Sequence, residues 1–272
     1  MDLYINKDTQ LCMSLSGRPG NFGTRFQNFL YRELGLNFVY KAFTTTDLGS
    51  AIAGIRALGI RGCAVSMPFK ESCIEYLDEL HSSAKGILSV NTIVNNGGCL
   101  TAYNTDYLAV LELLKFHAIP PDLGFAVRGS GGMAKAMVCA LRDAGFKDGL
   151  VVARNKSTGS ALASQYGYTW QPDFGNKRPP LLINTTPIGM TGGAETMELA
   201  FPAELLSASQ FVFDVVALPP ETPMTILARS LGKKVITGAE VSILQAVEQF
   251  VLYTGTRPGT ESIQRAALFA RS

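Results

Sequence analysis

The chain has 272 residues, of which 47% are hydrophobic and 17% charged, and its formal net charge is +2 at pH 7. This length allows two domains or one large one, and the composition is that of a globular protein. A net charge this small gives no reason to expect binding to nucleic acid or to an acidic membrane surface.

No apolar run approaches the length of a membrane span, and residues 1–8 lack the basic-then-apolar layout of a secretory signal. We therefore expect a cytoplasmic protein. The five cysteines are odd in number and have no metal-ligand spacing, so we expect buried free thiols. With only two histidines in the chain, we expect no metal site.

The first half of the chain alternates between strand and helix patterns. Strands are expected at 11–15, 36–43 and 60–65, followed by a hairpin at 90–94 and 99–103. Helices are expected at 24–34, from after residue 47 to about 58, and from 68 through 80. The alternation predicts an α/β domain with a mainly parallel sheet.

The second half begins with an expected helix at about 105–117, which leads to Pro120–Pro121, a rigid joint and an expected domain boundary. Further strands are expected at 150–153, 180–184, 211–216 and 234–236, and a helical pattern follows Gly238. We predict three parts, which comprise residues 1–106, 107–237 and 238–272.

A glycine cluster lies between an apolar run and a helical pattern of small residues. It has the form G-x-G-G-x-A and comprises Gly129, Ser130, Gly131, Gly132, Met133 and Ala134. Such glycines allow a tight turn and let backbone N–H groups approach a pyrophosphate at a helix N-terminus. Many strand-to-helix turns contain glycine without binding anything. The second apolar strand ends about twenty residues later, however, which is the separation expected of a dinucleotide-binding unit.

The residues after that second strand indicate which dinucleotide binds. The acidic residue that usually binds a ribose hydroxyl is absent, and Arg154, Asn155, Lys156 and Ser157 stand in its place. Basic and hydroxyl groups at this edge favour a 2′-phosphate, so we predict NADP. The alternative is that these side chains belong to a solvated loop.

Three polar groups in the first half are candidates for chemistry at the ends of strands. Lys70 follows Pro68 at the start of an expected helix, where a structural choice would more often be acidic. Asp106 lies in the first turn of another helix, and capping alone would also select it there. Asn91 begins an apolar strand, and a hydrogen bond to a turn is the alternative.

Six segments together make the chain resemble the shikimate dehydrogenase family. They keep the family's order and spacing and lie at 64–70, 89–94, 103–107, 129–134, 183–190 and 238–246. The resemblance implies an N-terminal α/β substrate domain and a Rossmann-type NADP-binding domain, with C-terminal helices that pack back on the first. It also implies oxidation of a secondary alcohol, in which a hydride acceptor and a proton acceptor both take part.

The same resemblance implies roles for individual residues. Lys70 and Asp106 would be the catalytic pair, and Asn91 and Gln245 would bind ring hydroxyls. Ser66 stands where the family usually has a threonine. NADP would be bound by the glycine turn (129–134) and by Arg154, Asn155, Lys156, Thr186, Val215 and Gly238.

The chain departs from the family at the Ser-x-Ser element that binds the substrate carboxylate. Counting back from Gln27–Asn28 places that element on 21–24, where Asn21 keeps a donor and Gly23 has no side chain. Ser14 and Ser16 lie about seven residues too early for it. Arg18 or Arg25 would then supply a charge for the carboxylate.

Two further departures concern the tyrosine after Asp214 and the NADP loop, where Ala217 and Thr158 replace a tyrosine and a second arginine. The pattern is most like the shikimate dehydrogenase-like branch. We expect an NADP-dependent enzyme acting on shikimate or a close cyclic hydroxy acid, as a monomer or a homodimer. The alternatives are a quinate or aminoshikimate dehydrogenase, or a protein that senses NADP or a metabolite.

Overall fold

The computed structural model describes residues 5–272, so the first four residues of the segment inspected for a secretory signal lie outside the described residues. The chain forms two compact units. The first contains the residues up to Thr105 together with Ile243–Ser272, and the second contains Asp106–Ser242. Their boundaries fall within helices α5 (Thr105–Phe116) and α10 (Gly238–Thr254), not at Pro120–Pro121.

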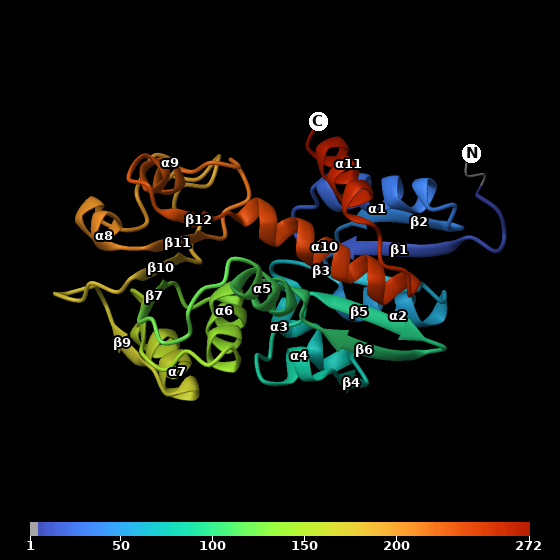
Figure 1. Ribbon diagram of the computed structural model, residues 1–272. Helices are drawn as coiled ribbons and strands as arrows, with labels where there is room; N and C mark the ends of the chain where they lie inside the picture. The colour runs from blue at the N-terminus through green and yellow to red at the C-terminus, as the bar shows by residue number, and fades with distance from the viewer. Residues whose placement is uncertain (1–4) are drawn as a thin grey trace. The chain divides into compact units, whose positions relative to one another are not determined.

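The first unit contains a six-stranded sheet with the order β2-β1-β3-β5-β6-β4 (Figure 1). Its strands are β1 (Gln10–Leu15), β2 (Phe38–Phe43), β3 (Gly62–Val65), β4 (Glu79–Leu80), β5 (Thr92–Asn96) and β6 (Cys99–Tyr103). β1 pairs in parallel with β2 and β3, whereas β5 runs antiparallel to β3 and β6. The carboxyl ends of β1, β3 and β6 therefore lie at the same edge of the sheet as the start of β5.

The helices of this unit are α1 (Phe22–Glu33), α2 (Leu48–Ala57), α3 (Phe69–Ser72), α4 (Ser82–Lys85), part of α10, and α11 (Thr260–Arg271). The helix expected through Leu80 is wrong. α3 stops at Ser72, a 3₁₀ turn covers Ile74–Tyr76, and β4 follows. Pairing with β6 overrides the helical pattern here, because β4 aligns with Thr101 and the Asp78 N–H donates to the Leu100 carbonyl.

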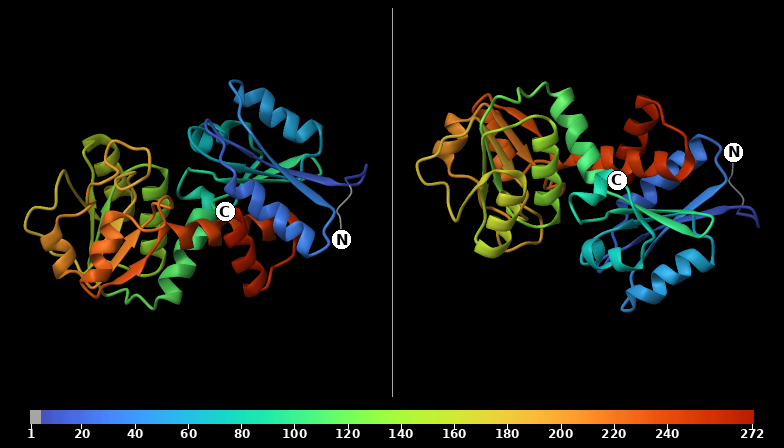
Figure 2. Two further views of the ribbon diagram at one scale, coloured as in Figure 1. Left: turned by 90° about the horizontal axis from the view of Figure 1, so that it is seen from above. Right: turned by 90° about the horizontal axis from the view of Figure 1, so that it is seen from below.

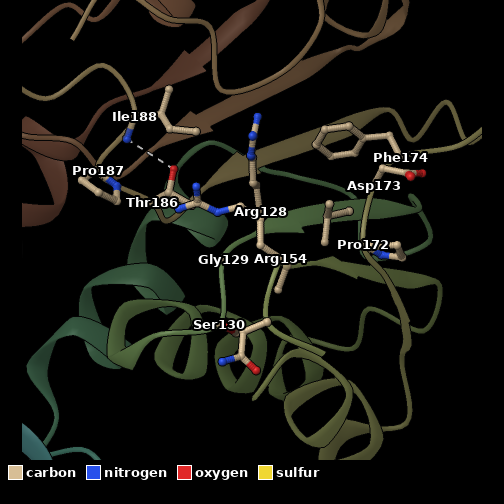
Figure 3. A pocket seen from close by; sticks show the side chains of 13 residues that line it. Arg128, Gly129, Ser130, Arg154, Pro172, Asp173, Phe174, Thr186, Pro187 and Ile188 are labelled. Carbon is tan, nitrogen blue, oxygen red and sulfur yellow. Dashed lines mark hydrogen bonds between the residues drawn. The ribbon is translucent and has the colours of Figure 1, made fainter. Parts of the chain in front are cut away.

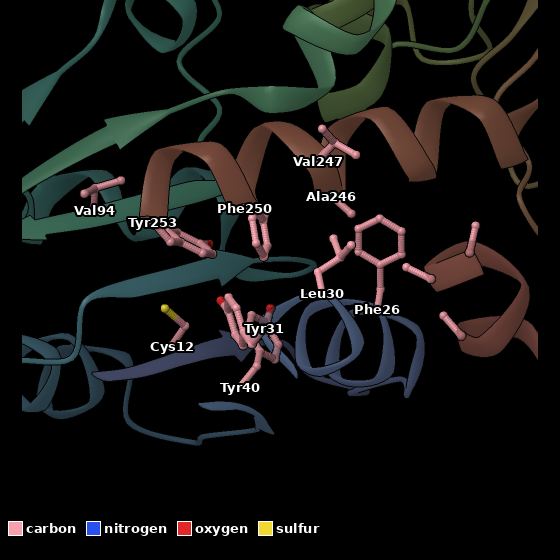
Figure 4. Close-up of a cluster of buried hydrophobic side chains, with 13 residues drawn as sticks. Cys12, Phe26, Leu30, Tyr31, Tyr40, Val94, Ala246, Val247, Phe250 and Tyr253 are labelled. Carbon is pink, nitrogen blue, oxygen red and sulfur yellow. The ribbon is translucent and has the colours of Figure 1, made fainter. Parts of the chain in front are cut away.

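The two faces of this sheet bury different side chains, as the two-residue repeat of a strand requires. Cys12 and Tyr40 face a core that α1 covers with Phe26 and Leu30 and α10 with Phe250 (Figure 4). α11 contributes Ala266, Ala267 and Ala270. α1 and α11 lie side by side in both views of Figure 2. Met13, Leu15 and Val65 face the opposite core, which α2 covers with Ile52 and Ile55.

The second unit contains an entirely parallel sheet with the order β12-β11-β10-β7-β8-β9. Its strands are β7 (Phe125–Arg128), β8 (Gly149–Val152), β9 (Thr169–Gln171), β10 (Leu181–Asn184), β11 (Phe211–Asp214) and β12 (Lys234–Ile236). Its further helices are α6 (Gly132–Asp143), α7 (Lys156–Tyr166), α8 (Ala203–Ala208) and α9 (Pro223–Ser230). Taken in chain order, the strands follow the Rossmann order 3-2-1-4-5-6, which confirms the predicted fold class.

All five cysteines are free, and four of them are buried, whereas Cys99 is partly exposed. Among residues 5–272, no helix combines the length and the apolar character that a membrane crossing requires.

Candidate functional site

A cavity of about 210 Å³ in the first unit lies where β1 and β3 end. It is lined by Ser14, Ser16, Arg18, Gly20, Phe22, Gly23, Tyr40, Ala64, Val65, Ser66, Lys70, Gln245, Ala246 and Gln249. Two of the lining side chains, Arg18 and Lys70, are cations, and none is a carboxylate. The cavity therefore suits a polar, anionic molecule. We call it the substrate cavity.

The loop after β3 brings two of the predicted residues into the substrate cavity. The Ser66 N–H donates to the Leu15 carbonyl, and the Ser66 carbonyl accepts from the Phe69 N–H at the start of α3. Lys70 is the second residue of α3, and its carbonyl accepts a hydrogen bond of 2.8 Å from the Val90 N–H. The backbone on both sides of the cavity wall is thus fixed by hydrogen bonds to neighbouring strands and loops.

Asn91 lies behind this cavity and is not one of its lining residues. Its side chain is 1% exposed, and its Nδ2 donates to Gln245 Oε1 at 3.3 Å. Its Oδ1 accepts from the Thr92 hydroxyl and from the N–H and hydroxyl of Thr105. In this structure Asn91 therefore orients Gln245, which does line the cavity, and also fixes the first residue of α5.

Asp106 follows Thr105 in the first turn of α5, and its side chain is 7% exposed. Gln249, which sequence reasoning missed, lies one helical turn after Gln245 on α10. It is 4% exposed, and its Nε2 donates to the Asn91 carbonyl and to the Thr92 hydroxyl. The spacing of two glutamines by four residues was the signal that could have found it.

The loop between β1 and α1 differs from the expectation for a carboxylate-binding element. Asn21 is exposed, makes no capping bond with its side chain, and does not line the cavity. Ser14, Ser16 and Arg18 do line it. Arg25 points elsewhere, because its Nη2 donates to the Ser272 hydroxyl and its guanidinium lies over the Phe269 ring.

The reason for this difference is spatial. Ser14 shares a sheet face with Tyr40, and the strand ends at Leu15, so Ser16 and Arg18 cross the edge of the sheet where the cavity opens. Counting along the sequence from the helix did not include this geometry.

A second cavity, of about 300 Å³, lies in the second unit at the carboxyl ends of β7, β8 and β10 (Figure 3). It is lined by Arg128, Gly129, Ser130, Val152, Ala153, Arg154, Asn155, Pro172, Asp173, Phe174, Thr186, Pro187 and Ile188. β7 and β10 are adjacent in this sheet although they are not consecutive in sequence. This is the point where the strand order reverses, and ligands of such sheets bind there. We call it the cofactor cavity.

Gly129 is required by the turn after β7. Its φ is +126°, and a Cβ atom at this position would lie 2.4 Å from Thr185 Oγ1. The Ser130 hydroxyl pairs with the Thr158 hydroxyl at 2.8 Å, and Asn155 caps α7 by accepting from the Thr158 N–H. These bonds tie the glycine turn to the loop after β8.

Other predicted cofactor residues do not line the cavity. Gly131, Gly132, Met133 and Ala134 form the cap and first turn of α6, Lys156 begins α7 and is exposed, and Val215 and Gly238 lie farther along the chain. A Cβ atom on Gly238 would fall 2.4 Å from the Val215 carbonyl oxygen. Gly238 therefore permits a close backbone approach at the start of α10.

Arg128 is a cofactor-cavity residue that sequence reasoning missed. Its guanidinium donates to the Ala200 carbonyl and lies over the Phe174 ring, 5.8 Å from the centroid. Burial lowers the pKa of Arg128, Glu195 and Glu198 raise it, and the nearby Arg154 lowers it. A charged residue at the end of an otherwise apolar strand was the sequence signal that could have identified Arg128. The cavity thus has two neighbouring guanidinium groups in its wall.

A buried network supports Thr186 in the cofactor cavity. Asn184 Oδ1 accepts from the Thr186 hydroxyl at 2.6 Å, and Asn184 Nδ2 donates to Asp214 Oδ1 at 3.0 Å. Asp214 is fully buried and also accepts from the Thr222 hydroxyl and the Val216 N–H. Burial raises the pKa of Asp214 to about 6, although these three donors lower it.

Comparisons with known proteins show the family to which this chain belongs. A family model described as the shikimate dehydrogenase substrate binding domain matches residues 23–93. A shikimate dehydrogenase-like protein of Haemophilus influenzae is 57% identical over 98% of this chain and 99% of its own length. A shikimate dehydrogenase (NADP(+)) of Pyrococcus abyssi is 35% identical over 89% of this chain and 90% of its own.

Among solved structures, shikimate 5-dehydrogenase of Thermus thermophilus in complex with NADP(H) and shikimate has a TM-score of 0.86 and 29% identity. The match covers 96% of this chain and 99% of that one. On the level of identity and on coverage of nearly the whole length, this chain belongs to the shikimate dehydrogenase family, in its shikimate dehydrogenase-like branch.

Proposed function

We propose that this protein is an NADP-dependent oxidoreductase that interconverts shikimate, or a close cyclic hydroxy acid, with its 3-keto form. The observation that carries the proposal is the substrate cavity, which combines Lys70, Ser66 and Gln245 with a second cation and no carboxylate. A hydroxy acid offers a carboxylate to such a wall and hydroxyl groups to its amide and serine. The relatives' names support the same activity.

The cofactor cavity fits NADP. Gly129 leaves no room for a side chain, so its backbone can approach a pyrophosphate, and α6 begins directly after the turn. Arg128, Arg154 and the Ser130 hydroxyl offer donors to a 2′-phosphate, and Asp173 is the carboxylate among the lining residues. When bound, NADP supplies the hydride acceptor.

The chain's own residues handle the proton and the substrate. As the alcohol carbon loses a hydride, its hydroxyl must release a proton. In this proposal Lys70 takes that proton, and Asp106 orients the amine and balances its charge. Gln245 and Ser66 bind neighbouring ring hydroxyls, and Asn91 keeps Gln245 in place through its bond to Oε1.

A second dehydrogenase substrate, quinate or an amino derivative of shikimate, is favoured by the loop at 21–24. Gly23 has no side chain and Asn21 stays outside the cavity, so the wall that meets the carboxylate is remodelled. A sensor of NADP or of a metabolite is a different class of protein, and it would have no need for a proton-transferring lysine.

Substituting Lys70→Ala separates an enzyme from a sensor. We expect turnover to fall by about 10²–10⁴-fold, while NADP affinity stays within about twofold because Lys70 does not line the cofactor cavity. Lys41→Ala is the matched control, since Lys41 is an exposed residue of β2 outside the substrate cavity. A Lys70→Ala protein with wild-type turnover would contradict the proposed chemistry.

A further inference from the structure

Tyr40 belongs both to the buried core of the first unit and to the wall of the substrate cavity. It is 3% exposed and packs with Cys12 and Tyr31 in the cluster of Figure 4. It also lines the substrate cavity together with Ser14 and Gly23. A phenol in this position presents its hydroxyl at the end of a ring that the core holds rigidly.

The Tyr40 hydroxyl lies next to the space that a side chain at position 23 would fill. A Cβ atom on Gly23 would be 3.6 Å from Tyr40 Oη and 3.8 Å from Cε1 of the same ring. These are ordinary contact distances, so a small side chain would fit but would meet the hydroxyl. The absence of a side chain at Gly23 therefore leaves Tyr40 Oη as the polar group on this part of the wall.

The surroundings of Tyr40 keep its hydroxyl protonated, because burial raises the pKa of Tyr40 well above its usual value. Its ring is held by packing in the buried core. Ser14 is on β1, and Tyr40 is on the adjacent strand β2 and shares its sheet face. A neutral phenol that is fixed in this way can donate to an anion in the cavity.

The charge of the cavity indicates which group of the substrate Tyr40 meets. Arg18 and Lys70 are the charged side chains in the wall, and both are positive. In the proposed reaction Lys70 serves the reacting hydroxyl, which leaves Arg18 as the partner for a carboxylate. Guanidinium and hydroxyl donors together bind a carboxylate well, because hydrogen bonds to a charged group are stronger than those between neutral groups.

We propose that the Tyr40 hydroxyl, held at the cavity wall by the packing of its ring, binds the substrate carboxylate together with Arg18, in place of the side chain that Gly23 lacks. This makes Tyr40 a specificity-determining residue of the substrate cavity. The inference rests on the proposed function, because it requires an anionic cyclic substrate in that cavity.

The test compares Tyr40→Phe with wild type in the reduction of NADP⁺ by shikimate and by its uncharged methyl ester. We expect the KM for shikimate to rise about tenfold or more and kcat to change less than about twofold. The KM for the ester should stay nearly constant, so the preference for the carboxylate falls. Phe keeps the ring and its packing, so the change removes only the hydroxyl.

Two further variants separate a binding role from a structural one. Tyr253→Phe removes a buried hydroxyl from the same core, and it should leave both KM values unchanged because Tyr253 does not line the cavity. Gly23→Ser in the Tyr40→Phe background restores a hydroxyl beside the vacated space, and we expect it to recover much of the lost affinity for shikimate.

The possible outcomes have different meanings. If wild type oxidises shikimate and Tyr40→Phe has the same KM, the inference is overturned and the proposed function stands. The same holds if the ester loses affinity as much as shikimate does. If wild type reduces no NADP⁺ with shikimate, quinate or the ester, the proposed function fails, and the inference that rests on it fails too.

Discussion

The cofactor cavity and the substrate cavity lie at the same kind of place, the carboxyl ends of parallel strands, but the chain builds them differently. Most of the cofactor cavity comes from one strand–helix–strand segment and the loops that follow it. The substrate cavity takes side chains from β1, α1, β2, the loop after β3, and α10. A local sequence motif can therefore predict the cofactor cavity, whereas the substrate cavity forms only when distant elements pack together.

In each cavity a buried asparagine orients a lining side chain, and the two asparagines differ in the charge of their other hydrogen-bond partners. Asn91 holds Gln245 and is itself bound by threonine hydroxyls and a backbone N–H, which are neutral. Asn184 holds Thr186 and is bound to the carboxyl group of Asp214. Only the asparagine of the cofactor cavity is thus coupled to an ionisable group by these bonds.

The largest effect should come from changing the glycine turn. We expect Gly129→Ala to destabilise the protein by about 3 kcal/mol or more. Its φ of +126° disfavours alanine, and the new methyl would meet Thr185, which bonds to the Arg128 carbonyl. Urea unfolding measures this change.

Gly131→Ala is the matched control for that substitution. Gly131 has a φ of −83°, and a Cβ atom there would meet nothing within 4 Å. Its stability should change by less than about 0.5 kcal/mol, because the added methyl group meets no other atom. Equal destabilisation by the two variants would show that the turn does not organise the cofactor cavity locally.

The next effect concerns pH. The pKa of Asp214 is raised to about 6 by burial, so the native state holds this proton more tightly than the unfolded chain does. Its contribution to stability is fully present below about pH 4 and is lost as pH rises through 6. We expect wild type to lose about 2–3 kcal/mol relative to Asp214→Asn across this window.

Urea unfolding of both proteins at several pH values between 4 and 7 measures this difference. All other carboxyl groups are common to the two proteins, so their contributions cancel in the comparison. If the free energies of unfolding of the two proteins changed in parallel with pH, the hydrogen-bond network of Asn184 and Asp214 would not be coupled to the titration of a buried acid. The hydrogen bonds described for Asn91 include no ionisable group, so the stability of Asn91 variants should show no comparable dependence on pH.

A smaller effect is expected at Arg128. Arg128→Met keeps an apolar contact with Phe174 but removes the charge, so the KM for NADP should rise about tenfold. The KM for NAD should rise less, because NAD has no 2′-phosphate. Arg229→Met is the control, since Arg229 pairs with Glu221 and does not line the cavity. An equal rise in KM for NADP and NAD would indicate that Arg128 contacts a part of the nucleotide other than the 2′-phosphate.

The contrast between the two cavities also explains how much the sequence predicts. The Rossmann-type fold, the strand positions and the turn at 129–134 follow from contiguous patterns, because short-range periodicity and glycine geometry are local properties. The helix expected through Leu80 failed because its last residues pair with a distant strand, and propensity does not include that pairing.

The substrate side shows the same limit in single residues. Asn21 was an expected carboxylate donor, yet the structure places Ser14, Ser16 and Tyr40 on the cavity wall, together with Arg18, one of the two arginines considered for this role. From the sequence, Tyr40 looks like an ordinary apolar position of β2, because its ring packs in the core although the residue also lines the cavity. Its role depends on the empty position at Gly23 in another element, which no local pattern reveals.

The decisive measurement is the steady-state rate of NADP⁺ reduction with shikimate, run beside quinate and with NAD⁺ as the control cofactor. We expect NADP-dependent oxidation of at least one of these cyclic hydroxy acids, with a kcat/KM of about 10⁴ M⁻¹s⁻¹ or more for the true substrate. NADP should be preferred to NAD. Tight NADP binding without oxidation of any such acid would contradict the claim that the cationic cavity of the first unit is the site of a dehydrogenase.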